Sequence, residues 1–128
     1  ELLNPYFIEQ LEYREDSAGP GKWRGGMGVT YRWRVDADHI TCANFGSGTR
    51  SKTAPYGLQG GKGAPPNRQI IYYADGREEE VVVNSMSIWS SGDKVELRSS
   101  GGGGFGKPKE RAVEKIVQDV KEGLVSIE

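Results

Sequence analysis

Glycine-rich stretches hold the residues of this sequence whose types and spacing could do chemistry. Residues 101–106 read GGGGFG and match G-x-G-x-x-G, a pattern in which glycine backbone approaches a dinucleotide at the start of a helix. The strand expected before this run, residues 95–98, alternates apolar and charged side chains, whereas a dinucleotide-binding strand is almost wholly apolar. We therefore interpret 101–106 as a strand-to-helix connection, with a small anion-binding nest at the helix N-terminus as the alternative.

Two lysines among glycines suggest phosphate-binding loops, but neither loop has the spacing G-x-x-x-x-G-K-[ST]. Ser51 precedes Lys52 where the pattern needs a glycine, and Gly63 follows Lys62 where it needs a hydroxyl residue. Neither loop is therefore interpreted as a Walker motif.

The single histidine and the single cysteine restrict metal and nucleophile chemistry. His39 lies beside an expected turn and is interpreted as a surface residue rather than a catalytic base. Cys42 lies within an expected strand and is interpreted as a small buried apolar side chain. One cysteine cannot form an internal disulfide or an all-cysteine zinc site. The sequence thus predicts no catalytic and no metal-ligating residue in this chain.

Two short segments interleave basic and aromatic residues, as proteins that stack single-stranded nucleic acid do. They are residues 22–24 (KWR) and residues 32–34 (RWR). Trp33 falls on the apolar face of its expected strand and is predicted to be in the core, which leaves Arg32 and Arg34 on a solvated face. The net charge of −1 gives no general attraction to nucleic acid or anionic lipid. A nucleic-acid-binding β module is kept as an alternative function.

The elements that must position these residues are mainly strands. Alternation is clearest over 27–35, which predicts a strand with one buried and one wet face. Residues 40–45 are predicted as the strand that pairs with it. The segment 46–67, with six glycines and three prolines, is expected to be a long loop. The other strands are expected at 8–15, 70–73, 80–83, 86–88 and 95–97, with a hairpin turn at Asp75-Gly76.

The hydrophobic period changes near the C-terminus. Apolar residues then follow the spacing of one helix face: Val113, Ile116, Val117, Val120 and Leu124. Pro108 suits the first turn and Gly123 the position past the end, so a helix is predicted over 108–122. Strands followed by one helix predict an α+β fold that is mainly antiparallel β, sandwich-like or barrel-like, with one C-terminal amphipathic helix.

The length of 128 residues suits one domain with a modest core. The chain opens on Glu1 rather than Met, in a stretch that reads like the middle of a protein, so we expect it to be a piece of a longer one. No run approaches the roughly 20 apolar residues of a membrane span, and a cytoplasmic location is expected.

Three separated segments carry a family resemblance. Residues 13–28 contain DSxGxGxxRGGxG, residues 55–65 contain GLxGGxGAP, and residues 91–126 contain GGGGxGxPxER followed by DVxxGxVS. In order and spacing they resemble the C-terminal region of the hydantoinase B/5-oxoprolinase family, to which the ATP-dependent N-methylhydantoinase B-type subunits belong. The resemblance covers almost the whole chain. One departure is Lys107, which stands where the family usually has Asp before the proline.

The resemblance implies part of an ATP-dependent enzyme that opens cyclic amides, such as hydantoins and 5-oxoproline, or that carboxylates ketones. It implies an A-type subunit or domain that handles ATP, and metal-binding His and Asp residues in an upstream part of the B-type subunit. None of these maps onto His39 or onto an Asp of this chain. We expect residues 1–128 to form one structural or assembly domain at the C-terminal end of such a subunit. This domain is expected to be inactive alone and without a cofactor, whereas ATP and a divalent metal are implied for the full enzyme.

The candidate interface residues lie within the three motifs. They are Arg24, Gly25, Gly26, Gly60, Gly61, Lys62, Gly101, Gly102, Gly103, Gly104, Phe105 and Gly106. Glycine loses the most entropy on ordering, so stretches this rich in it are expected where backbone must approach something closely. We expect that partner to be the remainder of the subunit or the A-like subunit, with Tyr56, Leu58 and Phe105 exposed and the loops partly mobile.

Overall fold

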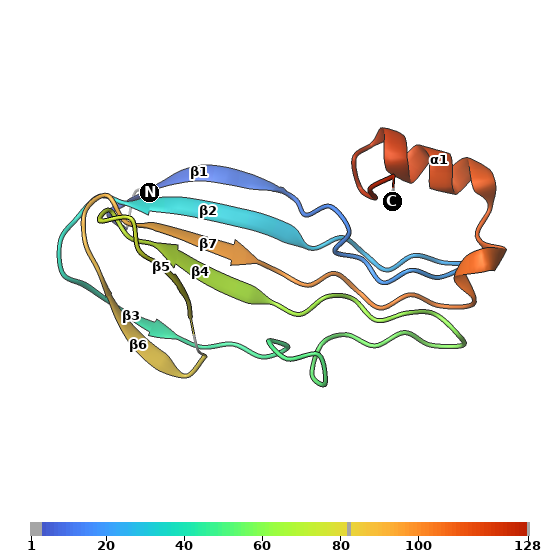
Figure 1. The fold of residues 1–128 in the computed structure, drawn as a ribbon, viewed down its shortest axis with the longest axis horizontal. Helices are drawn as coiled ribbons and strands as arrows, with labels where there is room; N and C mark the ends of the chain where they lie inside the picture. The colour runs from blue at the N-terminus through green and yellow to red at the C-terminus, as the bar shows by residue number, and fades with distance from the viewer. Residues whose placement is uncertain (1–3, 82, 128) are drawn as a thin grey trace.

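Two antiparallel sheets and one short helix make up the fold (Figure 1). The computed structural model describes residues 4–81 and 83–127. The strands are β1 (Tyr6–Tyr13), β2 (Val29–Val35), β3 (Ile40–Asn44), β4 (Arg68–Tyr72), β5 (Glu78–Glu80), β6 (Ser85–Trp89) and β7 (Lys94–Arg98). One sheet has the order β1-β2-β7-β4-β5, and the other is the hairpin β3-β6. The predicted α+β class is confirmed, and the sheets form a sandwich rather than a closed barrel.

The hydrophobic core lies between the two sheets. Its buried members are Val35, Ile71, Val81, Trp89 and Val95. Trp33 packs against this cluster, with its ring 6.2 Å from that of Trp89, as the alternation of β2 predicts. Cys42 packs there too, and burial raises the pKa of its thiol. The hairpin β3-β6 therefore packs against one face of the five-stranded sheet, and the apolar side chains between them hold the two sheets together.

The predicted pairing of 27–35 with 40–45 is wrong. Strand β2 pairs with β1 on one side and β7 on the other, which leaves it no free edge, and β3 pairs with β6 in the second sheet. The chain crosses between the sheets at residues 36–39, where His39 is exposed and takes a positive φ of 56°. There the Asp38 carboxylate accepts a hydrogen bond from the Ser91 backbone N–H at 3.0 Å. The connection is therefore a sandwich corner and not a hairpin turn.

The other predicted elements lie close to their expected places. The turn between β4 and β5 contains Gly76 at a φ of 90°, and β5 is exposed along its length; residue 82, in the strand expected at 80–83, lies outside the described residues. The expected helix is divided into a 3-10 turn, η1 (Pro108–Glu110), and the helix α1 (Val113–Lys121). Gly123 follows α1 at a φ of 67°, the left-handed position that ends many helices.

The three glycine-rich stretches run side by side beyond the ends of the strands, toward η1 and α1 (Figure 1). We call residues 17–28, 55–65 and 99–106 together the glycine array. Outside two isolated bridges they have no strand assignment, yet they are hydrogen-bonded to one another throughout. Gly102 receives the Gly19 N–H at 2.8 Å and donates to Gly26 at 2.9 Å.

Close backbone approach explains the glycines of this array. A Cβ built on Gly104 would lie 2.1 Å from the carbonyl oxygen of Pro20, and one on Gly61 would lie 2.1 Å from that of Gly104. Both distances are far below van der Waals contact, and the obstacle is backbone rather than a movable side chain. As on the axis of the collagen triple helix, only glycine fits between such chains. Gly26 is different, because a Cβ there meets no atom within 4 Å.

We predict that Gly104→Ala destabilises the chain by about 3 kcal/mol, because the new methyl group forces two backbone segments apart. Gly26→Ala is the matched control and should change the free energy of unfolding by less than about 1 kcal/mol, since its methyl group enters open space. Urea unfolding followed by circular dichroism measures both variants. Equal midpoints for the two variants would show that close approach does not hold the array.

Candidate functional site

All the sequence-predicted interface residues lie in or beside the glycine array, on adjacent stretches. Gly25 faces Gly102, since a Cβ at position 25 would lie 1.9 Å from the Gly102 carbonyl oxygen. Gly103 faces Tyr56 in the same way, at 1.8 Å. Phe105 exchanges two 2.9 Å backbone hydrogen bonds with Trp23. The close neighbour of each of these residues is therefore another stretch of the same chain, and the expected contact with the remainder of a subunit stays a prediction.

Five of the six backbone N–H groups of 101–106 donate hydrogen bonds inside the array. Gly101 donates to Ser17, Gly102 to Gly26, Gly104 to Lys62, Phe105 to Trp23 and Gly106 to Leu58, all between 2.9 and 3.0 Å. An anion-binding nest needs successive N–H groups that point at the anion. The element that follows is a three-residue 3-10 turn rather than a full helix. The alternative interpretation of this run as an anion nest is therefore not supported.

Lys62 acts in the array through its backbone. Its N–H donates to Pro20 at 2.7 Å, and its carbonyl accepts from Gly104 at 2.9 Å, while its side chain is exposed. Gly60, on the same loop, has a φ of 90°, a conformation that L side chains rarely adopt. The loop 57–63 thus crosses the array as a backbone partner, and its lysine resembles a phosphate ligand in sequence only.

Arg24 belongs to a buried charged cluster that fixes α1 to the array. Asp119 is the only buried residue of α1, and its carboxylate accepts a 2.7 Å hydrogen bond from Arg111. The Arg24 Nε lies 3.3 Å from the same carboxylate oxygen without an aligned hydrogen bond, so this contact is an ion pair. Arg111 also donates to the Lys22 carbonyl at 3.3 Å. Hydrogen bonds and charge, rather than apolar packing, therefore hold the helix.

A cavity of about 290 Å³ lies between α1 and the array. Arg24, Arg111 and Asp119 line it together with apolar residues that include Pro65 and Ile116. Its two arginines already share the Asp119 carboxylate, and Asp16 also lines the cavity, so two positive charges face two negative charges. We therefore interpret the cavity as a gap between packed elements rather than as a substrate pocket.

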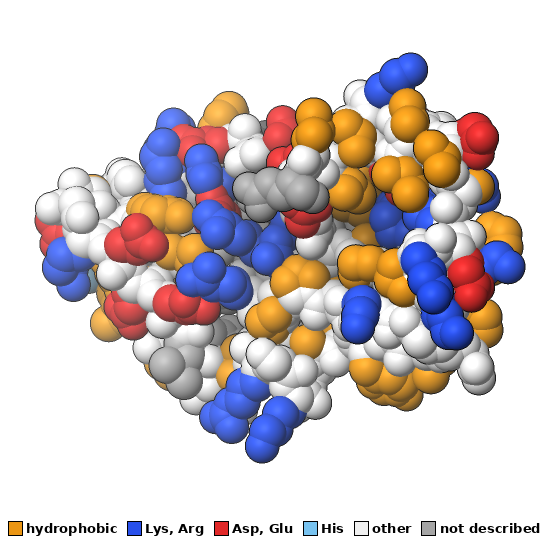
Figure 2. Space-filling model, turned by 45° about the vertical axis from the view of Figure 1, so that its right-hand side comes forward, with side chains coloured by type: hydrophobic (Ala, Val, Ile, Leu, Met, Phe, Trp, Pro, Cys, Tyr) orange, Lys and Arg blue, Asp and Glu red, His pale blue; other side chains and the backbone are white. Residues whose placement is uncertain are grey.

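An apolar surface covers the same end of the molecule. We call it the apolar end face, and its members are Trp23, Tyr56, Leu58, Phe105, Val113, Ile116 and Val117, all exposed. Phe105 is bridged to both Trp23 and Leu58, and the Lys115 ammonium lies 4.8 Å from the Trp23 ring centre, so α1 and the array form one surface. In Figure 2 hydrophobic side chains gather over this end, on the right. The predicted exposure of Tyr56, Leu58 and Phe105 agrees with the structure, at 77%, 55% and 48%.

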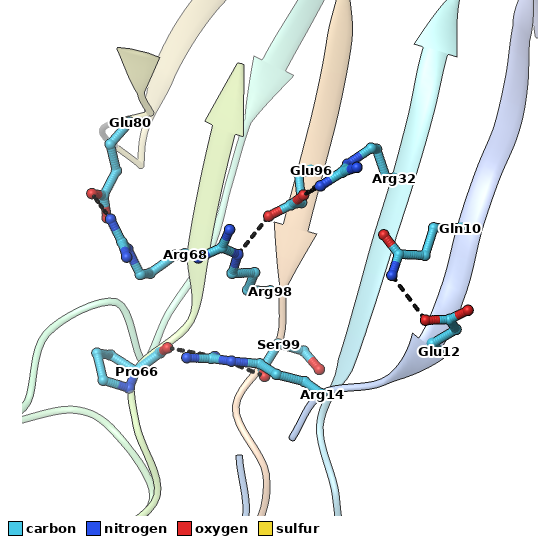
Figure 3. A network of polar contacts seen from close by, with 10 residues as sticks. All are labelled: Gln10, Glu12, Arg14, Arg32, Pro66, Arg68, Glu80, Glu96, Arg98 and Ser99. Atoms are coloured by element: carbon cyan, nitrogen blue, oxygen red, sulfur yellow. Dashed lines mark hydrogen bonds and ion pairs between the residues drawn. The ribbon is translucent and has the colours of Figure 1, made fainter. Parts of the chain in front are cut away.

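A second polar site, which sequence reasoning missed, lies on the outer face of the five-stranded sheet (Figure 3). Glu96 is 1% exposed in the central strand β7, and hydrogen bonds from Arg32 and Arg98 hold its carboxylate. Burial alone raises the pKa of Glu96, but the hydrogen bonds and charges of the two arginines outweigh it and lower the pKa overall. Arg32 was expected on a solvated face and instead neutralises a buried charge. One sequence feature could have indicated this buried ion pair: a glutamate within an expected strand, with a long basic residue two positions before it and another two positions after it.

We predict that Glu96→Gln lowers the free energy of unfolding at pH 7 by about 1–3 kcal/mol, because two arginines lose their shared carboxylate. The folded-state pKa of Glu96 lies below the unfolded value of about 4.3, so its contribution is present above that pH and is lost as the pH falls through the folded pKa. Denaturant melts from pH 7 to pH 3 should therefore show the gap to wild type closing in acid. The exposed Glu78→Gln is the control, and a gap that is independent of pH would contradict the assignment.

The described part of the chain offers no group of residues suited to bind a metal ion or a nucleotide. Among residues 4–81 and 83–127, no three His, Cys, Asp or Glu side chains are grouped as metal ligands would be. Five backbone N–H groups of residues 101–106 already donate hydrogen bonds within the array, as described above. No helix of the described residues is long and apolar enough to cross a bilayer. No reaction step can be assigned to these residues through a bound metal or ATP.

Comparison with known proteins places this geometry in a family. The sequence profile described as hydantoinase B/oxoprolinase matches residues 1–108. An uncharacterized protein of Methanocaldococcus jannaschii is 38% identical over 129 residues, which is 98% of this chain and 22% of that protein. Caprolactamase subunit beta of Pseudomonas jessenii is 32% identical over 132 residues, 100% of this chain and 22% of that subunit. The chain thus spans about a fifth of the length of these relatives.

A solved structure shows the same fold. Nucleotide-free acetone carboxylase superposes with a TM-score of 0.82 over 96% of this chain and 20% of its own, at 22% sequence identity. At that identity the likeness establishes the arrangement of sheets, array and helix and nothing about the reaction. The sequence profile matches residues 1–108, which is most of this chain, and the shared fold agrees with that match. This chain therefore belongs to the hydantoinase B/oxoprolinase family.

Proposed function

We propose that this chain is a structural and assembly domain of a B-type subunit in an ATP-dependent enzyme that opens cyclic amides. The observation that carries the proposal is the apolar end face, which combines residues of the profile-matched segments with the apolar side of α1 and is exposed in the chain alone. Exposed apolar patches rimmed by polar residues commonly mark interaction sites. The occupant that we infer is the remainder of the subunit, because matched relatives are about five times longer than this chain.

The position of the domain in the subunit and its partners are part of the same proposal. We place residues 1–128 as one domain at the C-terminal end, in the cytoplasm, with ATP handled by an A-like partner subunit. The relative named caprolactamase subunit beta supports a multi-subunit enzyme that acts on a lactam. A lactam is a cyclic amide, so it shares the bond that hydantoins and 5-oxoproline contain. The metal implied for the full enzyme would be bound outside this chain.

The two alternative functions have less support. Ketone carboxylation rests on acetone carboxylase, whose likeness at 22% identity concerns the fold alone. A single-strand nucleic-acid module needs exposed aromatic side chains beside free basic groups. Trp33 instead packs against the core, and Arg32 is engaged by Glu96. Cyclic-amide hydrolysis is therefore the proposal that we retain.

We predict that Val117→Asp separates folding from assembly. Val117 is 46% exposed on α1, so in the isolated chain the variant should unfold within about 0.5 kcal/mol of wild type. In a full-length subunit containing this chain, the aspartate would be buried where the domain docks on the remainder of the subunit. It should therefore prevent that docking, and with it the assembly of the subunit with its partner and ATP-dependent lactam turnover. Met86→Asp, at an exposed position on β6 away from this face, is the control and should leave assembly intact. Normal assembly of the Val117→Asp subunit, measured by size-exclusion chromatography, would refute this role for the face.

We also predict that the purified 128-residue chain neither hydrolyses ATP nor opens a lactam ring, because its described residues offer no metal site. Phosphate release and lactam consumption are the measurements. ATP-dependent turnover that is lost on Arg24→Ala or Lys62→Ala would overturn the proposal, since it would make the array itself catalytic.

A further inference from the structure

Three arginines converge where the outer face of the large sheet meets the glycine array (Figure 3). Arg68 and Arg98 lie directly opposite each other on β4 and β7. Arg14 follows β1 and donates to the Ser99 carbonyl at 3.2 Å, one residue past Arg98. Like charges directly opposite on neighbouring strands are destabilising. This juxtaposition therefore needs a compensating negative charge.

Carboxylates of the chain compensate two of the three arginines. Arg98 is paired with Glu96, which Arg32 shares, and Arg68 is paired with Glu80 at 2.6 Å. Arg14 has no carboxylate partner among the described residues. It contacts only the backbone carbonyls of Ser99 and, at 3.4 Å, Pro66. A guanidinium has five N–H donors, so most of its donor capacity remains available.

The electrostatic surroundings of Arg14 are positive. Burial lowers its pKa first, and then the charges of Arg98 and Arg68 lower it further. Arginine stays protonated in proteins, so this shift reports an unfavourable potential at a cation that cannot lose its proton. An anion placed beside Arg14 would relieve that potential.

The space beside Arg14 suits a small ligand. A hollow of about 510 Å³ is lined by Arg14, Arg32 and Arg98. Glu12 and Glu15 lie on the same lining, and Glu12 already accepts a 2.9 Å hydrogen bond from Gln10. Glu96 lines the hollow as well, where Arg32 and Arg98 already hold its carboxylate. Three carboxylates on the lining would repel a large polyanion, so the site suits a single oxyanion group beside Arg14.

We propose that Arg14, together with Arg98, binds one oxyanion group, a carboxylate or a phosphate, in this hollow on the outer face of the sheet. The planar fork of a guanidinium matches either group through two parallel hydrogen bonds. The site lies on the sheet face, apart from the apolar end face, and it does not depend on the proposed enzyme function. A free carboxylate metabolite and free phosphate are the two possible sources of this chemistry.

The test is a titration of the chain with inorganic phosphate and, separately, with succinate, at constant ionic strength maintained with chloride. Arginine Nε–H signals in NMR spectra report the site directly. Saturable shifts of the Arg14 and Arg98 signals are expected with at least one probe, and the probe that binds more tightly identifies the source as phosphate or carboxylate. Shifts that rise linearly with both probes would overturn the proposal.

Variants establish the role of Arg14. Arg14→Gln should weaken binding by about tenfold or more, because a charge-assisted fork is lost. Arg77→Gln removes the same charge from an exposed arginine of the β4–β5 hairpin and should change affinity by less than about twofold. Equal weakening by the two variants would show unspecific attraction and overturn the site.

A second variant keeps the proposal testable if Arg14→Gln fails to fold. Thr30 lies directly opposite Arg98 on β2, so Thr30→Asp adds a carboxylate to the site while every arginine remains. This variant should bind phosphate and succinate at least about tenfold more weakly, since its own carboxylate competes for the arginines. Unchanged affinity in folded Thr30→Asp would contradict the proposed position of the ligand.

Discussion

Close approach of backbone to backbone is the constraint on which the rest of this structure depends. Three stretches from distant parts of the sequence meet in the glycine array, and at Gly25, Gly61 and Gly103 a single Cβ would fall within about 2 Å of a neighbouring carbonyl oxygen. Hydrogen bonds between the stretches then satisfy backbone groups that have no sheet to join. The array thereby extends the sandwich into a second, side-chain-poor region that carries η1 and α1.

This construction explains the unusual composition of the chain. The sequence has 19 glycines and only 35% apolar residues, because the glycine array is held by backbone contacts and not by a hydrophobic core. The sandwich core is correspondingly small and consists of five buried residues with their neighbours. Glycine has the largest conformational entropy to lose, so the array is costly to order and needs the sheet at one end and the charged cluster at the other. Arg24 and Asp119 provide that second attachment.

The sequence predicted the local structure of each element better than it predicted which elements pair with one another. Alternation over 27–35 and the helical spacing after Val113 follow from side chains that each element must bury or expose, so those elements lie where expected. The pairing of 40–45 could not be obtained that way, because a short polar turn permits either a hairpin or a sandwich corner. Glu96 was missed for a related reason, since its burial depends on β7 being central in a sheet whose order the sequence does not show.

The glycines illustrate the same limit. Their density predicts close approach to something, but identifying the neighbour requires the three-dimensional arrangement, which supplies it from within the chain. The attachment of α1 also depends on contacts that the sequence pattern does not show. An amphipathic helix usually docks through its apolar stripe, whereas α1 is attached through Asp119 and leaves Val113, Ile116 and Val117 exposed. Attachment by a specific ion pair fixes the orientation of the helix without using its apolar side chains. These side chains therefore remain exposed, as the proposed docking on the remainder of the subunit requires.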